Sequence, residues 1–316
     1  MILVTFGVPG LDKTLLAPRE VVMPPPGKAF SHQELLALMP ECEAVLACGK
    51  ISRELMEAGK KLKLIVCYGA GYDSIDLLAA TELGIPVCNL PDTVTESTAE
   101  LAMTLMLALA RRIPELDRRV RSEKADAFGL GKRMGTSLSG SVLGIVGMGR
   151  IGGRVADFGR FMHMQVVYTA RTPKPRQEAL GAIRLSLNEL MRTADFISVH
   201  CPFSPETAKL VGREQIFSMK PTAFLINTAR GGVIDEAALI DALRQERIAG
   251  AAIDVYPQEP NVNPELIALP NVILTPHIGS NTLHTREIMA REACASMNLA
   301  LSGQRPPHLL NPETWR

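Results

Sequence analysis

Three short segments of the chain each carry one side chain that can bind an anion or transfer a proton. Arg230 lies in the segment 226–232, Glu259 in 254–260 and His277 in 274–280. A guanidinium can hold two oxygens in one plane, an imidazole titrates near neutral pH, and a carboxylate beside it favours the imidazolium. Taken singly, each also fits an ordinary role, as a surface cation, a loop carboxylate or a strand-end histidine. Because each segment follows a predicted strand, we expect all three at the carboxyl edge of a doubly wound sheet, where such folds bind ligands.

A glycine-rich motif, Gly147-Met148-Gly149-Arg150-Ile151-Gly152, directly follows the apolar run Val142–Val146 and opens a helical pattern. The first glycine permits a tight turn, the second lets the backbone approach a pyrophosphate, and the third allows close packing of helix on sheet. The helix N-terminus adds free N–H groups and a partial positive charge. With a strand, a helix and a following strand in place, the motif predicts a dinucleotide site.

The end of the next strand indicates which nicotinamide cofactor is bound. An NAD enzyme usually places an acid there to bind the ribose 2′-hydroxyl, whereas this chain has Thr169 followed by Arg171, with Lys174 and Arg176 just beyond. These cations can hold a 2′-phosphate, and no carboxylate at the strand end repels it. The pattern favours NADP(H), with NAD(H) possible; the alternative is a solvated loop in which Thr169 only caps the strand.

The elements that must position these residues are short apolar runs alternating with helical patterns. Such runs predict parallel sheets covered by helices on both faces. The predicted strands are Ile2–Phe6, Ala44–Ala47, Leu62–Val66, Ile85–Cys88, Val142–Val146, Val166–Tyr168, Phe196–Val199, Ala223–Ile226, Ala251–Val255 and Val272–Leu274.

Two long helices are predicted besides. One runs from about Ser97 to Arg121 and is expected to bridge the two sheets, and the other runs from about Thr282 to Leu301. The second helix would return the chain to the first domain and make that domain discontinuous.

Composition narrows the class of protein. A length of 316 residues favours two domains, and a net charge of +1 without long runs of one sign predicts no nucleic-acid or membrane partner. Six cysteines without a C-x-x-C pair suit reduced thiols, so neither a disulfide framework nor a metal site is expected. The apolar stretch Leu101–Ala110 is half the length of a membrane span. The start of the chain reads as a strand rather than a secretory leader, so we expect a cytoplasmic protein.

Further segments complete an ordered set of motifs over nearly the whole chain. They are VCYGAGYD at 66–73, IDL at 75–77, TAE at 98–100 and VHCP at 199–202. With the glycine motif and the three reactive segments, they resemble the signatures of the D-isomer-specific 2-hydroxyacid dehydrogenase family, in particular its glyoxylate and hydroxypyruvate reductases.

The resemblance implies a fold with two doubly wound parallel-sheet α/β domains and the cleft between them. Residues 1–96 and 282–316 would form a flavodoxin-like, substrate-binding domain, and residues 97–281 a Rossmann domain that binds NAD(P). It further implies an oxidoreductase in which NAD(P)H reduces a small 2-keto acid to the D-2-hydroxy acid. Such a reaction needs a cation for the carboxylate and carbonyl and an acid for the emerging alkoxide.

Arg230 fits the cation and His277, paired with Glu259, fits the acid. By the same resemblance, the backbone N–H groups of Ala70 and Gly71 would bind the substrate carboxylate, and Asp254 would lie near the nicotinamide carboxamide. The family also suggests a homodimer, with the predicted bridging helix at its interface. The residues expected to contact cofactor are Thr98, Gly147, Gly149, Arg150, Ile151, Gly152, Thr169, Arg171, Cys201, Thr228, Asp254, His277 and Gly279.

One departure weakens any inference about the substrate. Many family members carry a tryptophan after the bridging helix, whereas the only tryptophan here is Trp315, so the pocket wall or the dimer contact is expected to differ. Three further functions stay open: reduction of a sugar-derived keto acid, oxidation of another small oxyanion such as phosphite, or nicotinamide sensing by a co-repressor that binds without turnover. Formate is disfavoured, because the formate branch carries glutamine where this chain has Glu259.

Overall fold

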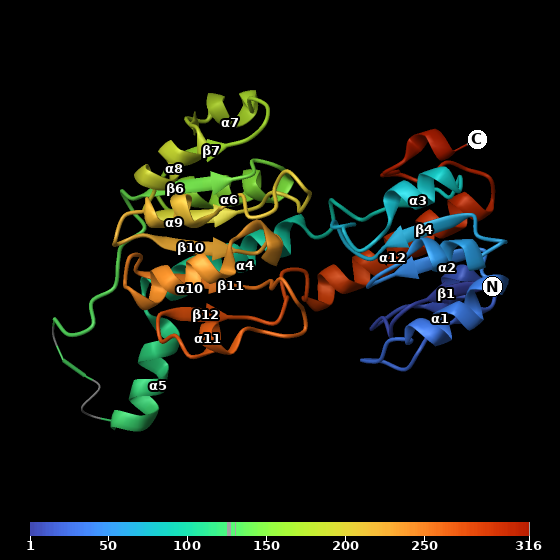
Figure 1. Ribbon diagram of the computed structural model, residues 1–316, viewed down its shortest axis with the longest axis horizontal. Coiled ribbons are helices and arrows are strands. Elements are labelled where there is room, and N and C mark those ends of the chain that lie inside the picture. The colour runs from blue at the N-terminus through green and yellow to red at the C-terminus, as the bar shows by residue number, and fades with distance from the viewer. Residues whose placement is uncertain (125–127, 130, 316) are drawn as a thin grey trace. The chain divides into compact units, whose positions relative to one another are not determined.

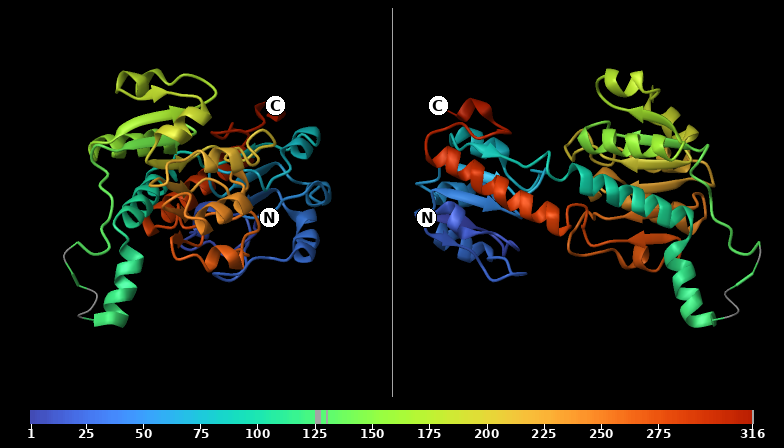
Figure 2. Two further views of the ribbon diagram at one scale, coloured as in Figure 1. Left: turned by 60° about the vertical axis from the view of Figure 1, so that its left-hand side comes forward. Right: turned by 180° about the vertical axis from the view of Figure 1, so that it is seen from behind.

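The computed structural model describes residues 1–124, 128–129 and 131–315, and the chain folds into two compact units (Figures 1 and 2). The first unit comprises Met1–Val94 and Ser280–Arg316, and the second comprises Thr95–Gly279. In each unit a sheet of parallel strands lies between two layers of helices. The predicted fold class of two parallel-sheet α/β units is therefore confirmed.

The described residues of the first unit form a five-stranded sheet in the order β2-β1-β3-β4-β5. This is the flavodoxin-like order, in which the direction of the connections reverses between β1 and β3. The strands are β1 Ile2–Val4, β2 Val21–Val22, β3 Ala44–Ala47, β4 Leu64–Cys67 and β5 Val87–Cys88, and the helices are α1 His32–Leu38, α2 Arg53–Ala58, α3 Leu77–Glu82 and α12 Leu283–Leu301, with 3₁₀ turns at Lys13–Leu16, Met39–Glu41 and Pro312–Thr314.

Alternation along the strands explains why both faces of this sheet are apolar. Leu46 of β3 belongs to the cluster that includes Met297 of α12, while its neighbour Val45 belongs to the cluster that includes Leu55 of α2. Successive strand residues point to opposite faces, so a continuous apolar run is stable only when helices cover both sides. The late helix α12 covers one face and the early helices α1, α2 and α3 cover the other.

The described residues of the second unit form a seven-stranded sheet in the order β12-β11-β10-β9-β6-β7-β8. Its connections reverse between β6 and β9, as in a dinucleotide-binding fold. The strands are β6 Val142–Val146, β7 Gln165–Thr169, β8 Ile183–Arg184, β9 Phe196–Val199, β10 Phe224–Asn227, β11 Gly250–Ile253 and β12 Val272–Leu274, and the helices are α4 Thr95–Ala110, α5 Ile113–Glu123, α6 Arg150–Phe161, α7 Pro175–Ala179, α8 Leu187–Thr193, α9 Arg213–Phe217, α10 Glu236–Arg244 and α11 Pro264–Ile267, with a 3₁₀ turn at Gly231–Val233.

The single long helix expected from Ser97 to Arg121 is wrong. The chain forms α4 and then α5, separated by a turn at Arg112, whose φ of 54° is left-handed. Pro114 follows in the first turn of α5, where a missing N–H is harmless, whereas inside one continuous helix it would remove a backbone hydrogen bond. The helix α4 packs on α6, β10 and β11 within the second unit, and α5 extends away from that sheet (Figures 1 and 2).

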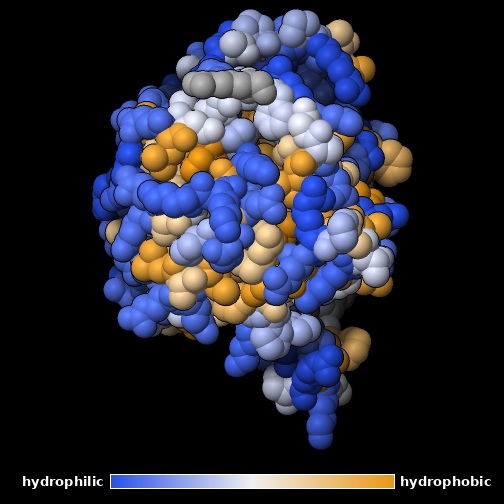
Figure 3. All heavy atoms as spheres, turned by 90° about the vertical axis from the view of Figure 1, so that its right-hand side faces the viewer, coloured by the Kyte–Doolittle hydropathy of each residue, from blue (hydrophilic) through white to orange (hydrophobic). Residues whose placement is uncertain are grey.

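Two strands were not predicted because their apolar runs are too short. Both β2 and β8 are two residues long and lie at sheet edges, and Ile183 and Arg184 of β8 are exposed. On the side shown in Figure 3, hydrophobic side chains lie in small groups among hydrophilic ones. On that side of the described residues, the surface therefore offers no single broad hydrophobic face.

Candidate functional site

The glycine motif forms the turn from β6 into α6 at the point where the connections of the second sheet reverse. Gly147 has a φ of 98°, and a Cβ there would lie 2.5 Å from the backbone nitrogen of Cys201. A Cβ on Gly152 would lie 2.3 Å from the carbonyl oxygen of Gly147, whereas above Gly149 the space is open. Two of the glycines therefore allow close packing and the middle one leaves the N-terminus of α6 accessible. Arg150 and Ile151 form the first turn of that helix.

The loop after β7 is held from both sides. Lys174 donates its backbone N–H to the hydroxyl of Tyr168 at 2.8 Å, and Arg184 donates Nη2 to the carbonyl oxygens of Ala170 and Arg171 at 2.9 and 3.1 Å. The side chain of Arg171 is thus carried by a fixed backbone just past Thr169. Sequence reasoning missed both anchors, because Tyr168 reads as a strand residue and β8, which carries Arg184, was not predicted.

A carboxylate that the sequence did not indicate lies within electrostatic reach of Arg171. The pKa of Glu206, in the loop after β9, is lowered mainly by its hydrogen bond from Ser204, and the positive charge of Arg171 adds to the shift. The absence of an acid at the end of β7 is therefore partly offset by an acid in the loop after β9. The electrostatics of this loop depend on both residues.

The imidazole of His277 and the carboxylate of Glu259 form a direct pair. The ring nitrogen Nδ1 lies 2.7 Å from Oε2 of Glu259, and the two side chains are 46% and 35% exposed. The other oxygen, Oε1, accepts the backbone N–H of Tyr256 at 2.9 Å. Because Nδ1–H donates to the carboxylate, Nε2 is left as the ring nitrogen available to a ligand.

The charge state of Glu259 follows from these contacts. Partial burial alone would raise the pKa of its carboxyl, but hydrogen bonds from His277 and the backbone of Tyr256, with the charges of His277 and Arg230, hold the pKa below the ordinary 4.5. A carboxylate with a lowered pKa stabilises the fold at neutral pH, and this contribution is lost as the pH falls below 4.5. Glu259 is therefore ionised at neutral pH.

Arg230 is brought toward this pair by a close backbone contact. A Cβ on the next residue, Gly231, would lie 2.1 Å from the carbonyl carbon of Tyr256, so only glycine allows the two loops to touch. Asn227, buried at the end of β10, accepts the N–H of Ala229 and donates to the carbonyl of Arg230, both at 3.0 Å. Arg230 is half-buried, and Nη1 donates to the carbonyl of Ala229 at 2.7 Å.

A buried carboxylate, Asp254, fixes the loop that carries His277. Its Oδ1 accepts the hydroxyl of Thr275 at 2.7 Å and the N–H of Ile278 at 2.8 Å, and Oδ2 accepts the N–H of Gly279 at 3.0 Å. Burial raises its pKa, against the effect of these hydrogen bonds. His277 itself has a φ of 53° and donates its N–H to the carbonyl of Asp254. The role of Asp254 as an anchor of this loop was not foreseen from the sequence.

Several other expected cofactor residues border the same region. An added Cβ on Gly279 would lie 3.3 Å from the Thr98 side chain and 3.5 Å from Oδ2 of Asp254. Thr228 follows β10, and its hydroxyl is buried without a hydrogen-bond partner among the described residues. An unpartnered buried hydroxyl and an open helix N-terminus are what a bound dinucleotide would satisfy, so these residues fit a nicotinamide cofactor.

The neighbouring groups on the β9 loop are unsuited to proton transfer. Burial lowers the pKa of His200 to about 3, and its Nε2 pairs with the hydroxyl of Ser198 at 2.8 Å. Burial also raises the pKa of the Cys201 thiol to about 11. At neutral pH both side chains are uncharged, and they line the loop next to Gly147.

The expected carboxylate-binding residues belong to the first unit. Ala70 and Gly71 follow β4, and Gly69 before them has a φ of 146°. Ala70 is half-buried and Gly71 is exposed. The described residues contain no cluster of three metal-ligating side chains, and among the helices built from them, none has the length and apolar character needed to cross a membrane.

The second unit thus presents a dinucleotide-binding edge together with an acid–base pair and a cation, the arrangement of a dehydrogenase. Comparison with known proteins identifies the family within this class. The family model for the NAD binding domain of D-isomer specific 2-hydroxyacid dehydrogenases matches residues 103–279. A glyoxylate reductase of Thermococcus litoralis is 43% identical over 293 residues, which cover 90% of this chain and 88% of the relative.

Solved structures agree. A protein of Thermus thermophilus superposes with a TM-score of 0.90 at 41% identity, over 98% of this chain and 99% of that one. The NADPH-dependent glyoxylate/hydroxypyruvate reductase of Sinorhizobium meliloti, in complex with NADP and malonate, superposes with a TM-score of 0.87 at 30% identity, over 100% and 98% of the two chains. The chain belongs to the D-isomer specific 2-hydroxyacid dehydrogenase family, and it is a nicotinamide-dependent oxidoreductase.

The pair of His277 and Glu259 generates a test of the contact between them. Glu259→Gln keeps the size of the side chain but replaces the ionised acceptor that Nδ1 of His277 faces. We expect kcat for 2-keto acid reduction to fall by about 10- to 100-fold, because the ring loses the partner that orients it. The measurement is kcat at neutral pH under saturating substrate, with Gln258→Ala as the neighbouring control. A kcat that stays within about twofold of that of the natural chain would remove Glu259 from this role.

Proposed function

We propose that this protein reduces glyoxylate or hydroxypyruvate to the corresponding D-2-hydroxy acid, with NADPH preferred over NADH. The observation that carries the proposal is the 2.7 Å contact of His277 with Glu259 beside Arg230. Relatives named as glyoxylate reductases and the NADP complex of a glyoxylate/hydroxypyruvate reductase support the substrate class. The first unit is assigned to substrate binding and the second to cofactor binding.

Each reactive group has one task in the proposed reaction. A reduced nicotinamide, when bound, would supply the hydride that adds to the 2-carbon of the keto acid. The guanidinium of Arg230 would bind the carboxylate and polarise the carbonyl, and the backbone N–H groups of Ala70 and Gly71 are assigned to carboxylate binding. His277 delivers the proton from Nε2 to the emerging alkoxide, and Glu259 stabilises the imidazolium until that transfer. In the oxidative direction the same pair accepts the proton.

The cofactor contacts are assigned on the geometry of the second unit. Gly147, Gly149, Arg150, Ile151 and Gly152 would bind the pyrophosphate at the start of α6. Thr169 and Arg171 would lie at the adenosine ribose, where Arg171 would pair with a 2′-phosphate. The residues assigned to the nicotinamide half are Thr98, Cys201, Thr228, Asp254, His277 and Gly279.

The activity is tested with purified protein, glyoxylate, hydroxypyruvate and pyruvate, each with NADPH and with NADH. We expect His277→Ala to lower kcat by about 10² to 10⁴-fold while the dissociation constant for NADPH changes little, because His277 is the proton donor of the proposed reaction but only one of several residues assigned to the cofactor. Loss of NADPH absorbance gives the rates, and His163→Ala is the control. A protein that binds NADPH but turns over none of these acids would instead favour a nicotinamide-sensing role.

Cofactor preference is tested at the loop after β7. Arg171→Ala is expected to raise the KM for NADPH about tenfold and to leave that for NADH within about twofold, since only the former carries the 2′-phosphate. Glu206→Gln should shift preference further toward NADPH, because it removes a negative charge near Arg171. Arg192→Ala, an exposed cation on α8, controls for net charge. Equal losses for the two cofactors would contradict the assignment.

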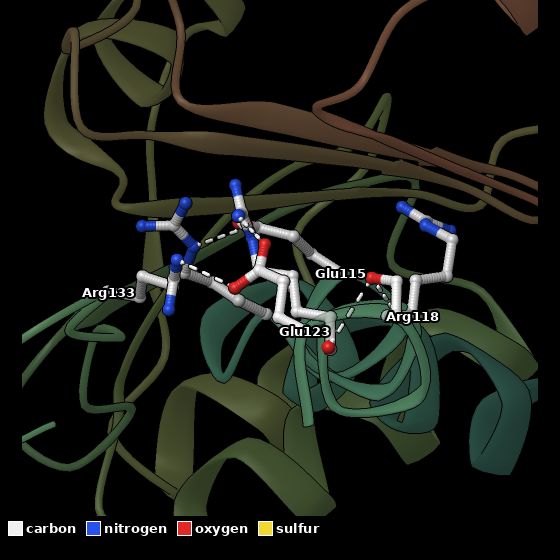
Figure 4. A network of polar contacts seen from close by, with 7 residues as sticks. Glu115, Arg118, Glu123 and Arg133 are labelled. Carbon is white, nitrogen blue, oxygen red and sulfur yellow. Dashed lines mark hydrogen bonds and ion pairs between the residues drawn. The ribbon is translucent and has the colours of Figure 1, made fainter. Parts of the chain in front are cut away.

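A homodimer formed through α5 is part of the same proposal. None of the residues of α5 is buried, and Ile113 and Val120, seven residues apart, are 55% and 49% exposed. Ion pairs of Arg112 and Arg119 with Glu115, and of Arg119 and Arg133 with Glu123, brace the helix (Figure 4). Apolar residues at this spacing share one face of a helix, which suits contact with a second copy.

Light scattering after gel filtration measures the assembly. We expect a dimer for the natural chain and a shift toward the monomer for Val120→Asp, because a charge on the apolar face of α5 opposes its burial. Leu78→Asp, which places the same charge on an exposed leucine of α3, should leave the mass unchanged. If the Val120→Asp protein is as dimeric as the natural chain, the interface does not include this face of α5.

A further inference from the structure

Two neighbouring residues at the end of β5 capture two consecutive carbonyl groups of the loop after β4. Asn89 donates Nδ2 to the carbonyl oxygen of Ala70 at 2.6 Å, and Leu90 donates its backbone N–H to the carbonyl oxygen of Gly69 at 2.9 Å. Asn89 is only 6% exposed and Leu90 is 2% exposed. All four residues belong to the first unit. The orientations of the two peptide groups that follow Gly69 and Ala70 are therefore fixed.

The direction of the opposite N–H groups follows from peptide geometry. A trans peptide is planar, and its C=O and N–H point in opposite directions. Holding the carbonyl of Gly69 therefore aims the N–H of Ala70 away from residues 89–90, and holding the carbonyl of Ala70 does the same for the N–H of Gly71. Neither N–H donates a hydrogen bond to any residue that the structure describes. Two adjacent donors on one side form a concavity that suits an anion.

The side chain of Asn89 also affects the strength of the donor it positions. A peptide whose carbonyl accepts a hydrogen bond is polarised, so its N–H becomes a better donor. The contact is short and largely shielded from water, which strengthens it further. The main-chain bond from Leu90 survives any change of side chain, whereas the bond to Ala70 depends on the amide of Asn89 alone. A single substitution of Asn89 can therefore remove the bond to Ala70 and leave the bond to Gly69 in place.

We propose that Asn89 is a positioning residue for substrate, which aims and polarises the N–H of Gly71 toward the carboxylate of the keto acid. The inference rests on the proposed function, in which Ala70 and Gly71 bind that carboxylate. Asn89 is uncharged and acts through Gly71. It therefore sets affinity for the substrate without taking part in hydride or proton transfer.

A purely structural role is the competing explanation, since Asn89 also ties the loops after β4 and β5 together. Asn298 of α12 provides a matched control, because its Nδ2 donates to the carbonyl oxygen of Leu15 at 2.7 Å within the same unit. Both residues are asparagines whose side-chain amide donates to a backbone carbonyl. Only Asn89 bonds to the loop after β4, which carries Ala70 and Gly71. A structural role would change thermal stability without a selective effect on substrate affinity.

The test compares Asn89→Ala and Asn298→Ala in the full-length protein by steady-state kinetics. For Asn89→Ala we expect the KM for glyoxylate or hydroxypyruvate to rise about tenfold, the scale of one lost hydrogen bond. We expect kcat and the KM for NADPH to stay within about twofold. All three parameters should be nearly unchanged in Asn298→Ala.

Asn89→Asp keeps the shape of the side chain if the alanine variant does not fold. Its carboxylate faces the carbonyl of Ala70 without a donor, so the KM for keto acid should rise at least as much. Titration calorimetry of the NADPH-loaded protein with oxamate, a non-reducible carboxylate analogue, should show weaker binding in both Asn89 variants. A keto-acid KM that stays within twofold in a folded Asn89 variant, or a cofactor KM that rises equally, would overturn the inference. A natural chain that reduces no keto acid would overturn the proposed function itself.

Discussion

The reaction proposed for the second unit depends on one hydrogen bond, that from Nδ1 of His277 to Glu259. It decides which ring nitrogen carries a fixed proton, and so it leaves Nε2 as the atom that can exchange a proton with a ligand. The carboxylate can serve this purpose because it is held from two sides, by the ring and by the backbone of Tyr256, and because its pKa stays low. An acid–base group on two separate loops works only if both loops are rigid.

That rigidity comes from a buried carboxylate and a glycine. Asp254 accepts hydrogen bonds from three donors in residues 275–279. These bonds hold the backbone of His277 in a left-handed conformation that few residues adopt freely. Gly231 lets the Arg230 loop lie against Tyr256, and the positive charge of Arg230 helps to lower the pKa of Glu259. The reactive side chains are partly exposed, while the groups that orient them are buried. Reactivity and rigidity are thus divided between different residues.

The sequence was sufficient for the features that repeat a strong physical pattern. Apolar runs located most of the strands, and the glycine motif located the start of α6, because both patterns follow from backbone geometry alone. The break at Arg112 was missed although Pro114 marks it. No glycine separates α4 from the charged residues that follow, and those residues are also compatible with a helix. Anchors such as Arg184, Asn227 and Asn89 could not be found, because each acts on a backbone atom that is distant along the chain or hidden in a turn.

In the proposed function, the two units bind an anion in different ways. After β6 the chain enters α6 within a few residues, and the amides of the first helical turn already point the same way. After β4 the chain runs through several loop residues before α3 begins at Leu77, so no helix aligns the amides of Ala70 and Gly71. Captured carbonyls replace the helix there, and the donors are aimed by residues on the neighbouring strand end. A donor pair of this kind can be tuned by a side chain, whereas a helix N-terminus is set by the backbone.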